Sequence, residues 1–141
     1  MPMKIAIDIG GVISKYPDIF RELNRALRVR AGTIEVHVVT DMHPIEGVLK
    51  TLEDNDIDVS PWRVHVADYG RHGDACKAVL LRDLQIDVFI DDHPGYLVWP
   101  WPTPAPLRLR VEPDPYRPYW HPGWKCEGGD FGRRVYLGGT R

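Results

Sequence analysis

Acidic side chains follow three short apolar stretches of the sequence, and these are the positions where chemistry is to be expected. Asp8 follows KIAI, Asp41 follows IEVHVVT, and Asp91 and Asp92 follow VFI. In parallel α/β sheets, ligands bind outside the carboxyl ends of the strands. Carboxylates gathered there repel one another unless a cation neutralises them, and their oxygens suit Mg²⁺. Lys77 is expected to bring a fixed positive charge to the same edge.

The elements that must position these acids alternate between strand and helix. Apolar, β-branched runs predict strands over residues 4–8, 34–40, 62–67, 86–90 and 107–111; the last alternates apolar residues with arginine, as in an edge strand with one solvated face. Apolar residues at helical spacing predict helices over residues 17–30, 43–55 and 73–84. The alternation predicts an α/β fold with a parallel sheet of about five strands.

Length and composition fit one globular domain. A chain of 141 residues with 43% hydrophobic content can bury roughly 68% of its unfolded surface. The net charge of −2 and a pI near 6.3 favour neither nucleic acid nor an anionic membrane as a partner. The two cysteines form no metal-spaced pair, and no apolar run reaches 18 residues. We therefore expect a soluble cytoplasmic protein; the sequence carries no signal for its oligomeric state.

The composition changes toward the carboxyl terminus. Nine of 13 prolines lie between residues 94 and 122, and nine of 14 aromatic residues lie between residues 96 and 136. We expect a core over residues 1–112 and an irregular Pro/Trp-rich arm over residues 113–141. The tryptophans of the whole proline-rich stretch are expected to pack irregular chain against the core: Trp99, Trp101, Trp120 and Trp124. Residues 101–141 also mix seven Lys/Arg with four Asp/Glu. Single-stranded nucleic-acid binding is thus an alternative, though an excess of three charges makes it the weaker one.

The stretch IAIDIGGVISK, residues 5–15, resembles the opening of two kinds of phosphate-handling enzyme. In sugar-kinase and actin-like ATPases, an Asp-Ile-Gly-Gly turn wraps the nucleotide phosphates. That fold resembles two large domains closing on ATP, which 141 residues cannot hold. In haloacid-dehalogenase-like (HAD-like) hydrolases, the aspartate itself attacks phosphorus within the pattern Asp-x-Asp-Gly-Thr/Val-Leu/Ile. DIGGVI, starting at Asp8, matches this pattern except that Gly10 replaces the second acid.

Three further motifs follow in the order of the HAD-like family. Thr40 ends the apolar strand of the second motif, Lys77 stands at the third, and Asp91 with Asp92 ends the strand of the fourth. The resemblance spans roughly residues 4 to 111 and implies a three-layer Rossmann-like core. Because helical periodicity begins at Pro17, no room remains for a cap domain, and the chain resembles a small capless member.

The resemblance implies a role for each of these residues. Asp8 would form an aspartyl-phosphate, while Thr40 and Lys77 would bind the phosphoryl oxygens. Mg²⁺ would be held by carboxylates and by the Gly-Gly turn, in which Gly10 offers its backbone carbonyl. The residues implied in cofactor and metal binding are Asp8, Gly10, Gly11, Asp91 and Asp92.

Gly10 leaves the family's proton transfer without its usual acid. In family phosphatases the second acid protonates the leaving group and activates water, and such help is worth about 10² to 10⁴-fold. His43 and His93 each follow the carboxyl end of a predicted strand and can replace it. Two functions stay open: a Mg²⁺-dependent phosphohydrolase acting on an exposed phosphate, or a catalytically silent module that recognises a phosphorylated small molecule, macromolecule or protein partner.

Several of these residues also have purely structural interpretations. His43 and His93 can be loop residues ahead of proline turns, which is the commoner case, and Asp41 can be a helix N-cap. A lysine on an amphipathic helix is by default a solvated charge, as Lys77 would be outside the motif order. Cys76 is expected to be a small buried thiol rather than an activated one.

Overall fold

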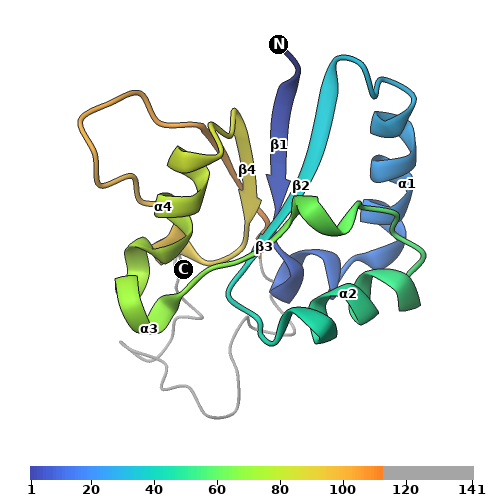
Figure 1. Cartoon of the computed structure of the whole chain (residues 1–141), viewed down its shortest axis with the longest axis horizontal. Helices are drawn as coiled ribbons and strands as arrows, with labels where there is room; N and C mark the ends of the chain where they lie inside the picture. Colours follow the sequence, from blue (N-terminus) through green and yellow to red (C-terminus); the bar gives the residue numbers. More distant parts are fainter. Residues whose placement is uncertain (113–141) are drawn as a thin grey trace. The chain divides into compact units, whose positions relative to one another are not determined.

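A computed structural model describes residues 1–112, and its five strands form one sheet in which every pairing is parallel (Figure 1). The expectations for residues 113–141, Trp120 and Trp124 among them, lie outside the described residues. The sheet has the order β3-β2-β1-β4-β5, and this confirms the predicted α/β fold with a parallel sheet. Its strands are β1 (Met3–Ile7), β2 (Ile34–Thr40), β3 (Val64–Val66), β4 (Val88–Asp91) and β5 (Leu107–Arg110).

Helices cover both faces of the sheet because successive strand residues point to opposite sides. On one face α1 (Pro17–Arg28) and α2 (Ile45–Asp54) pack against Ile5, Ile7, Val36 and Val38, in one buried cluster. On the other face α4 (Cys76–Asp83) packs against the alternate residues of the strands, in a second cluster that includes Ala6, Val39 and Phe89. The central strand β1 thus contributes to both clusters.

The predicted third helix is wrong over its first turn. Residues 73–84 were expected to form one helix, but Gly73–Ala75 form a 3₁₀ turn and α4 begins at Cys76. Gly73 has a φ of +60°, which an α-helix cannot contain, so the chain changes direction there. Before it, Tyr69–His72 form the short helix α3, whose first turn is capped by Asp68 through a hydrogen bond from the backbone N–H of Arg71.

The two edge strands also differ from the prediction. β3 is shorter than residues 62–67 because Pro61–Arg63 form a 3₁₀ turn before it. β5 pairs with β4, as the edge-strand interpretation requires. Its leucines are nevertheless solvated: Leu107 is 61% exposed and Leu109 45%. The alternation of leucine and arginine therefore identified an edge strand. The expectation that only the arginine face would meet solvent is wrong, because the leucine face is exposed as well.

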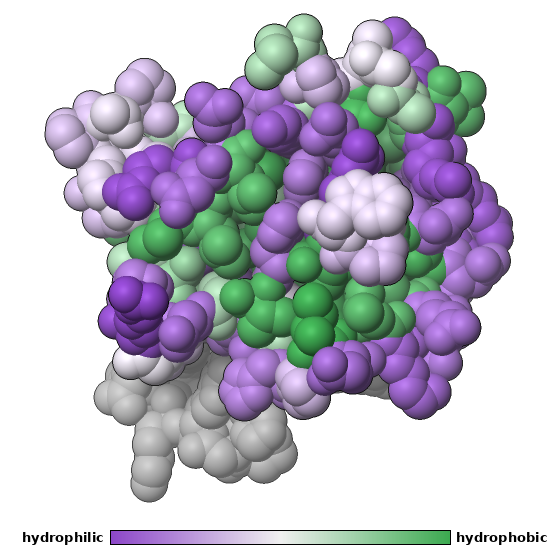
Figure 2. All heavy atoms as spheres, viewed as in Figure 1, coloured by the Kyte–Doolittle hydropathy of each residue, from purple (hydrophilic) through white to green (hydrophobic). Residues whose placement is uncertain are grey.

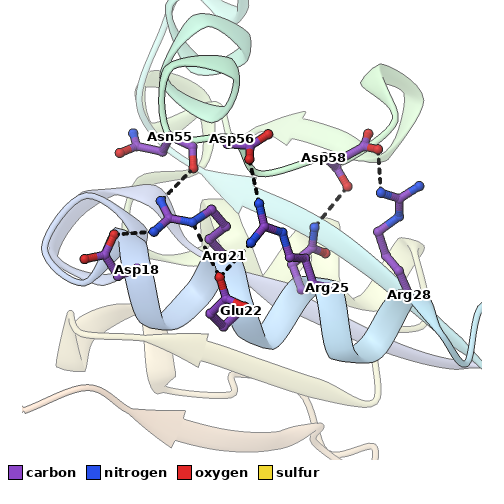
Figure 3. Close-up of polar contacts among 9 residues, drawn as sticks. Asp18, Arg21, Glu22, Arg25, Arg28, Asn55, Asp56 and Asp58 are labelled. Atoms are coloured by element: carbon purple, nitrogen blue, oxygen red, sulfur yellow. Dashed lines mark hydrogen bonds and ion pairs between the residues drawn. The ribbon is translucent and has the colours of Figure 1, made fainter.

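Helix α1 is fixed to the segment between α2 and β3 by polar contacts (Figure 3). Arg25 forms an ion pair with Asp56 at 2.6 Å, and Arg28 forms one with Asp58 at 2.5 Å. The buried Asn24 also donates a hydrogen bond from Nδ2 to the backbone carbonyl of Asp58, at 3.0 Å. These contacts tie together two segments that are about 30 residues apart in the chain.

The segment between β4 and β5 packs partly on the α4 side. Trp99 lies against the second core cluster and meets Trp101 edge-on, with ring centroids 5.2 Å apart. The guanidinium of Arg82 lies 4.3 Å from the Trp101 ring centroid. The predicted packing of Trp99 against the core is confirmed.

The visible face is mostly hydrophilic, with apolar side chains showing beside α4 and over α2 (Figure 2). The large apolar side chains that are exposed in the described residues include Ile45, Trp62 and Tyr69. Within residues 1–112, none of the helices has both the length and the apolar character needed to cross a membrane.

Candidate functional site

The strand register brings the predicted acids together at the carboxyl edge of the sheet. Ile7 of β1 pairs with Ile90 of β4, and the backbone N–H of Asp8 donates to the carbonyl of Ile90 at 3.0 Å. The next residues along the two strands are therefore neighbours. Carboxylate oxygens of Asp8, Asp91 and Asp92 all lie within 4.8 Å of one another, and all three side chains are buried. This confirms the predicted grouping of these three residues.

Lys77 lies between two of these carboxylates. Its side chain is 0% exposed, and its Nζ lies 2.9 Å from Asp8 Oδ1 and 2.7 Å from Asp91 Oδ2. The ring centroid of Tyr96 lies 4.5 Å from the same Nζ, a cation–π contact. Burial by itself lowers the pKa of Lys77, but the two carboxylates outweigh it and the pKa is raised. Lys77 is thus a buried ammonium in the site, and its interpretation as a solvated charge is wrong.

Asp91 and Asp92 differ in their partners, although they are adjacent. Asp91 accepts hydrogen bonds from Lys77 at Oδ2 and from the backbone N–H of His93 at Oδ1, the latter at 2.9 Å. Asp92 is 2% exposed, and neither of its carboxylate oxygens has a hydrogen-bond partner. A buried carboxylate without a partner is costly, so the Asp92 carboxylate requires a proton or a cation.

The Gly-Gly turn contacts this carboxylate directly. Gly11 has a φ of +72°, and a Cβ placed on it would lie 1.9 Å from Asp92 Oδ2. Gly10 differs in both respects: its φ of −67° suits any residue, and a Cβ there would meet nothing within 4 Å. The structure therefore requires glycine at position 11, whereas position 10 has room for a side chain.

The pKa values of two carboxyls are raised in this arrangement. Burial raises the pKa of Asp8 to about 7, with Lys77 opposing the shift and Asp91 reinforcing it. Burial, together with the charges of Asp91 and Asp8, raises the pKa of Asp92 to about 9. When all three carboxyls are ionised they carry three negative charges against the one positive charge of Lys77. The difference of two is the charge of one divalent cation.

The residues fit such an ion by the chemistry of their donors. Carboxylate oxygens are the ligands that Mg²⁺ and Ca²⁺ prefer. The unpartnered oxygens of Asp92 are directed into the cluster, because Gly11 lies on one side of them and carboxylate oxygens of Asp8 and Asp91 lie within 4.8 Å. The structure thus supports a metal-ion site at Asp8, Asp91 and Asp92.

Thr40 is buried and hydrogen-bonded at the end of β2. Its side chain is fully buried, and its Oγ1 accepts a hydrogen bond from the backbone N–H of Met42 at 3.1 Å. Its backbone carbonyl accepts from the N–H of Ala67 beside it. Because its oxygen accepts from Met42, the Thr40 hydroxyl keeps its hydrogen as a donor.

Asp41 has a partner that the sequence did not suggest. Its Oδ2 accepts a hydrogen bond from the Tyr96 hydroxyl at 2.7 Å, and the N-cap position of α2 is occupied by Pro44. The capping interpretation of Asp41 is therefore wrong. Tyr96 itself was missed as a site residue; it is buried and contacts both Lys77 and Asp41. Its only sequence signal was its place four residues after Asp92.

The two histidines proposed as replacement acids are placed differently. His43 is exposed in the segment before α2. His93 directly follows Asp92, accepts a hydrogen bond at Nδ1 from the N–H of Gly95, and has its ring centroid 4.6 Å from that of Tyr96. Burial lowers the pKa of His93. His93 is thus harder to protonate than an ordinary histidine, and its Nδ1 already accepts a hydrogen bond.

Cys76 precedes Lys77 in α4 and is 1% exposed. Burial raises the pKa of its thiol. A thiol that resists ionisation is a poor nucleophile, so the interpretation of Cys76 as a small buried thiol is confirmed.

Two cavities within residues 1–112 lie apart from these carboxylates. One of about 330 Å³ is lined by residues of α2 and the segment after it, and one of about 180 Å³ is lined by residues of α1, β2 and the segment before β3. Neither is lined by Asp8, Asp91 or Asp92.

Comparison with protein-family models, curated proteins and solved structures found no match for this chain. The fold and site by themselves define an α/β protein with a parallel sheet and a buried carboxylate–ammonium cluster at its carboxyl edge.

Proposed function

We propose that the chain is a small, capless HAD-like protein with a Rossmann-like core, and that it acts as a Mg²⁺-dependent phosphohydrolase on an exposed phosphate. The observation that carries the proposal is the state of Asp92: a buried carboxylate with two unpartnered oxygens, next to Asp8 and Asp91. The excess of two negative charges over Lys77 supports a divalent ion at this place. The four motif positions Asp8, Thr40, Lys77 and Asp91–Asp92 support the phosphate chemistry.

Each side chain has a role in this proposal. Mg²⁺, when bound by Asp8, Asp91 and Asp92, would supply positive charge to a phosphoryl group. A carboxylate oxygen of Asp8 forms a bond to phosphorus while the bond to the leaving oxygen breaks, giving an aspartyl-phosphate that water then hydrolyses. Lys77 fixes the Asp8 carboxylate through its ion pair, and the Thr40 hydroxyl donates to a phosphoryl oxygen.

The leaving oxygen needs a proton, and this is the weak point of the proposed catalyst. Gly10 provides no acid, and His93 has a lowered pKa with Nδ1 already hydrogen-bonded. General acid help is worth about 10² to 10⁴-fold in rate. We therefore propose a slow phosphohydrolase.

The same observation favours a second candidate function, a silent binding module. A site with an intact carboxylate cluster and no acid at position 10 is suited to hold a phosphorylated ligand, whether a small molecule or a segment of a partner protein, without cleaving it. The two candidates share the metal site and differ only in turnover.

The experiment that tests the proposal uses position 10, because an aspartate fits there without displacing backbone. The parent, Asp8→Asn and Gly10→Asp are assayed on a panel of phosphomonoesters with and without Mg²⁺. Gly32→Asp is the matched control, since a Cβ at Gly32 also meets nothing within 4 Å and the added charge lies between α1 and β2.

For a phosphohydrolase, the parent shows slow Mg²⁺-dependent turnover, Asp8→Asn abolishes it, and Gly10→Asp raises it by about 10² to 10⁴-fold. Turnover that appears only in Gly10→Asp supports the binding module instead. Turnover that is unchanged in Asp8→Asn contradicts the assignment of Asp8. Absence of both turnover and calorimetric binding of Mg²⁺ with phosphate contradicts both candidates.

A further inference from the structure

Two histidines lie side by side on neighbouring strands, outside the carboxylate cluster. His65 of β3 pairs with Val39 of β2 in the strand register, and His37 precedes Val39 by two residues, so both imidazoles lie on the same face of the sheet. This is the face that α4 covers, because Val39 belongs to the second core cluster. His37 is buried and His65 is partly exposed.

The ring nitrogens that face each other have the spacing of two ligands to one metal ion. His37 Nδ1 lies 3.1 Å from His65 Nε2, and the ring planes are 21° from parallel. Two imidazole nitrogens bound to a tetrahedral ion at 2.0–2.1 Å lie about 3.3–3.4 Å apart. Both nitrogens can therefore bind the same ion if they move apart by a few tenths of an ångström and each ring turns, so that its lone pair points at the ion instead of at the other ring.

Glu35 prepares His37 for this role. Its Oε1 lies 3.1 Å from Nε2 of His37, the nitrogen that does not face His65. A carboxylate at that nitrogen keeps the hydrogen on Nε2 and leaves the lone pair of Nδ1 directed toward His65. Histidines that bind metals commonly donate their second N–H to a carboxylate in this way. Arg63 lies 3.9 Å from the other oxygen of Glu35 and helps to keep Glu35 ionised.

We propose that His37 and His65 bind one divalent transition-metal ion of the kind that prefers imidazole, such as Cu²⁺ or Zn²⁺, with Glu35 orienting His37 and water completing the coordination. Nitrogen ligands favour these ions, whereas the carboxylate cluster favours Mg²⁺. The ion reaches the pair from the side of the partly exposed His65. Once bound, it joins the three-residue edge strand β3 to β2, and this site is independent of the proposed phosphohydrolase activity.

The test is a Cu²⁺ titration of the full chain followed by electron paramagnetic resonance, with millimolar Mg²⁺ present. We expect one tight equivalent whose spectrum shows coupling to nitrogen. His65→Gln lowers the affinity at least tenfold, and Glu35→Gln lowers it about 10- to 100-fold through the orientation of His37. His72→Gln, which changes an exposed histidine of α3, is the matched control and leaves the affinity unchanged, as does Asp92→Asn.

Circular dichroism confirms that each variant is folded before its affinity is compared. His65→Gln is preferred to a change at His37 because His65 is partly exposed and the variant keeps a polar side chain there. Equal Cu²⁺ affinity in the parent and in His65→Gln overturns the proposal and leaves the pair as an N–H···N hydrogen bond. Loss of the signal in Asp92→Asn also overturns it, since the ion would then be bound by the carboxylates.

Discussion

The α-carbon of Gly11 lies against the carboxylate of Asp92 so closely that a Cβ on Gly11 would be 1.9 Å from Asp92 Oδ2. Gly11 also has a φ of +72°, a conformation that costs residues other than glycine about 1–2 kcal/mol. The turn after β1 is therefore shaped around a carboxylate that follows β4.

Replacement of Gly11 by alanine is expected to destabilise the protein by at least about 2 kcal/mol, because backbone strain and the displacement of Asp92 add together. Urea denaturation measures the change in the free energy of unfolding. Gly10→Ala is the control: it has an ordinary φ and open space, so its free energy of unfolding should stay close to that of the parent. Equal stability of the two variants would contradict the close contact between Gly11 and Asp92.

Replacement of Lys77 by methionine is expected to cost about 3–5 kcal/mol in the free energy of unfolding, since it leaves Asp8 and Asp91 buried without their cation. The double variant Lys77→Met/Asp91→Asn removes one of the two buried charges that are left without a cation, and should recover part of the loss. Lys50→Met, which breaks the solvated ion pair with Asp54, is the control and should have little effect. Additive effects of Lys77→Met and Asp91→Asn would show that the two side chains are not coupled.

Stability is expected to fall between pH 7.5 and 8.5 when divalent ions are removed with a chelator. The pKa of Asp92 is raised from 3.8 to about 9, so over this interval the folded protein keeps a proton that the unfolded chain has lost. The free energy of unfolding then decreases as pH rises, by at most about 1.4 kcal/mol per pH unit for one proton. Thermal unfolding at a series of pH values measures the slope.

Other groups contribute mainly outside this interval. The pKa of Asp8, raised to about 7, acts with the same sign below pH 7.5. The lowered pKa values of His37, His65 and His93 act near pH 6.5 and with the opposite sign, and the raised pKa of Cys76 acts above pH 9. Asp92→Asn should flatten the slope. Saturating Mg²⁺ should flatten it in the parent as well, because a bound cation favours the ionised carboxylate. A slope that Mg²⁺ leaves unchanged would argue against an ion at Asp92.

Replacement of Asn24 by alanine is expected to cost about 1–3 kcal/mol, because it removes the buried hydrogen bond that joins α1 to the carbonyl of Asp58. Arg28→Ala removes a neighbouring ion pair between the same segments (Figure 3). That pair is solvated on both sides, so its loss should be small and should shrink further at high salt. Urea denaturation at low and high salt distinguishes the contribution of the Asn24 hydrogen bond from that of the Arg28–Asp58 ion pair. A larger effect for Arg28→Ala would show that the ion pairs dominate this contact.

Local patterning determined the order of the strands and both ends of β2, whereas β1 (predicted over 4–8) and β4 (predicted over 86–90) each differ from the prediction by one or two residues at their ends. Residues 34–40 form β2 as predicted, because five of these seven residues are β-branched and such side chains favour a strand. The prediction did less well where backbone geometry decides, as at Gly73, whose positive φ separates α3 from α4. Periodicity does not record the φ of a single glycine.

The sequence also predicted which carboxylates lie together at the edge of the sheet. Asp8, Asp91 and Asp92 were predicted at the sheet edge because each follows an apolar run, and parallel strands end together. The tertiary structure alone decided that the carboxylate oxygens of Asp92 have no hydrogen-bond partner and that Lys77 is fully buried between Asp8 and Asp91. It also decided that Asp41 accepts a hydrogen bond from Tyr96 instead of capping a helix. These contacts join residues from 14 to 69 positions apart. Their distances depend on the packing of α4 and of the β4–β5 segment on the sheet, which no local pattern contains.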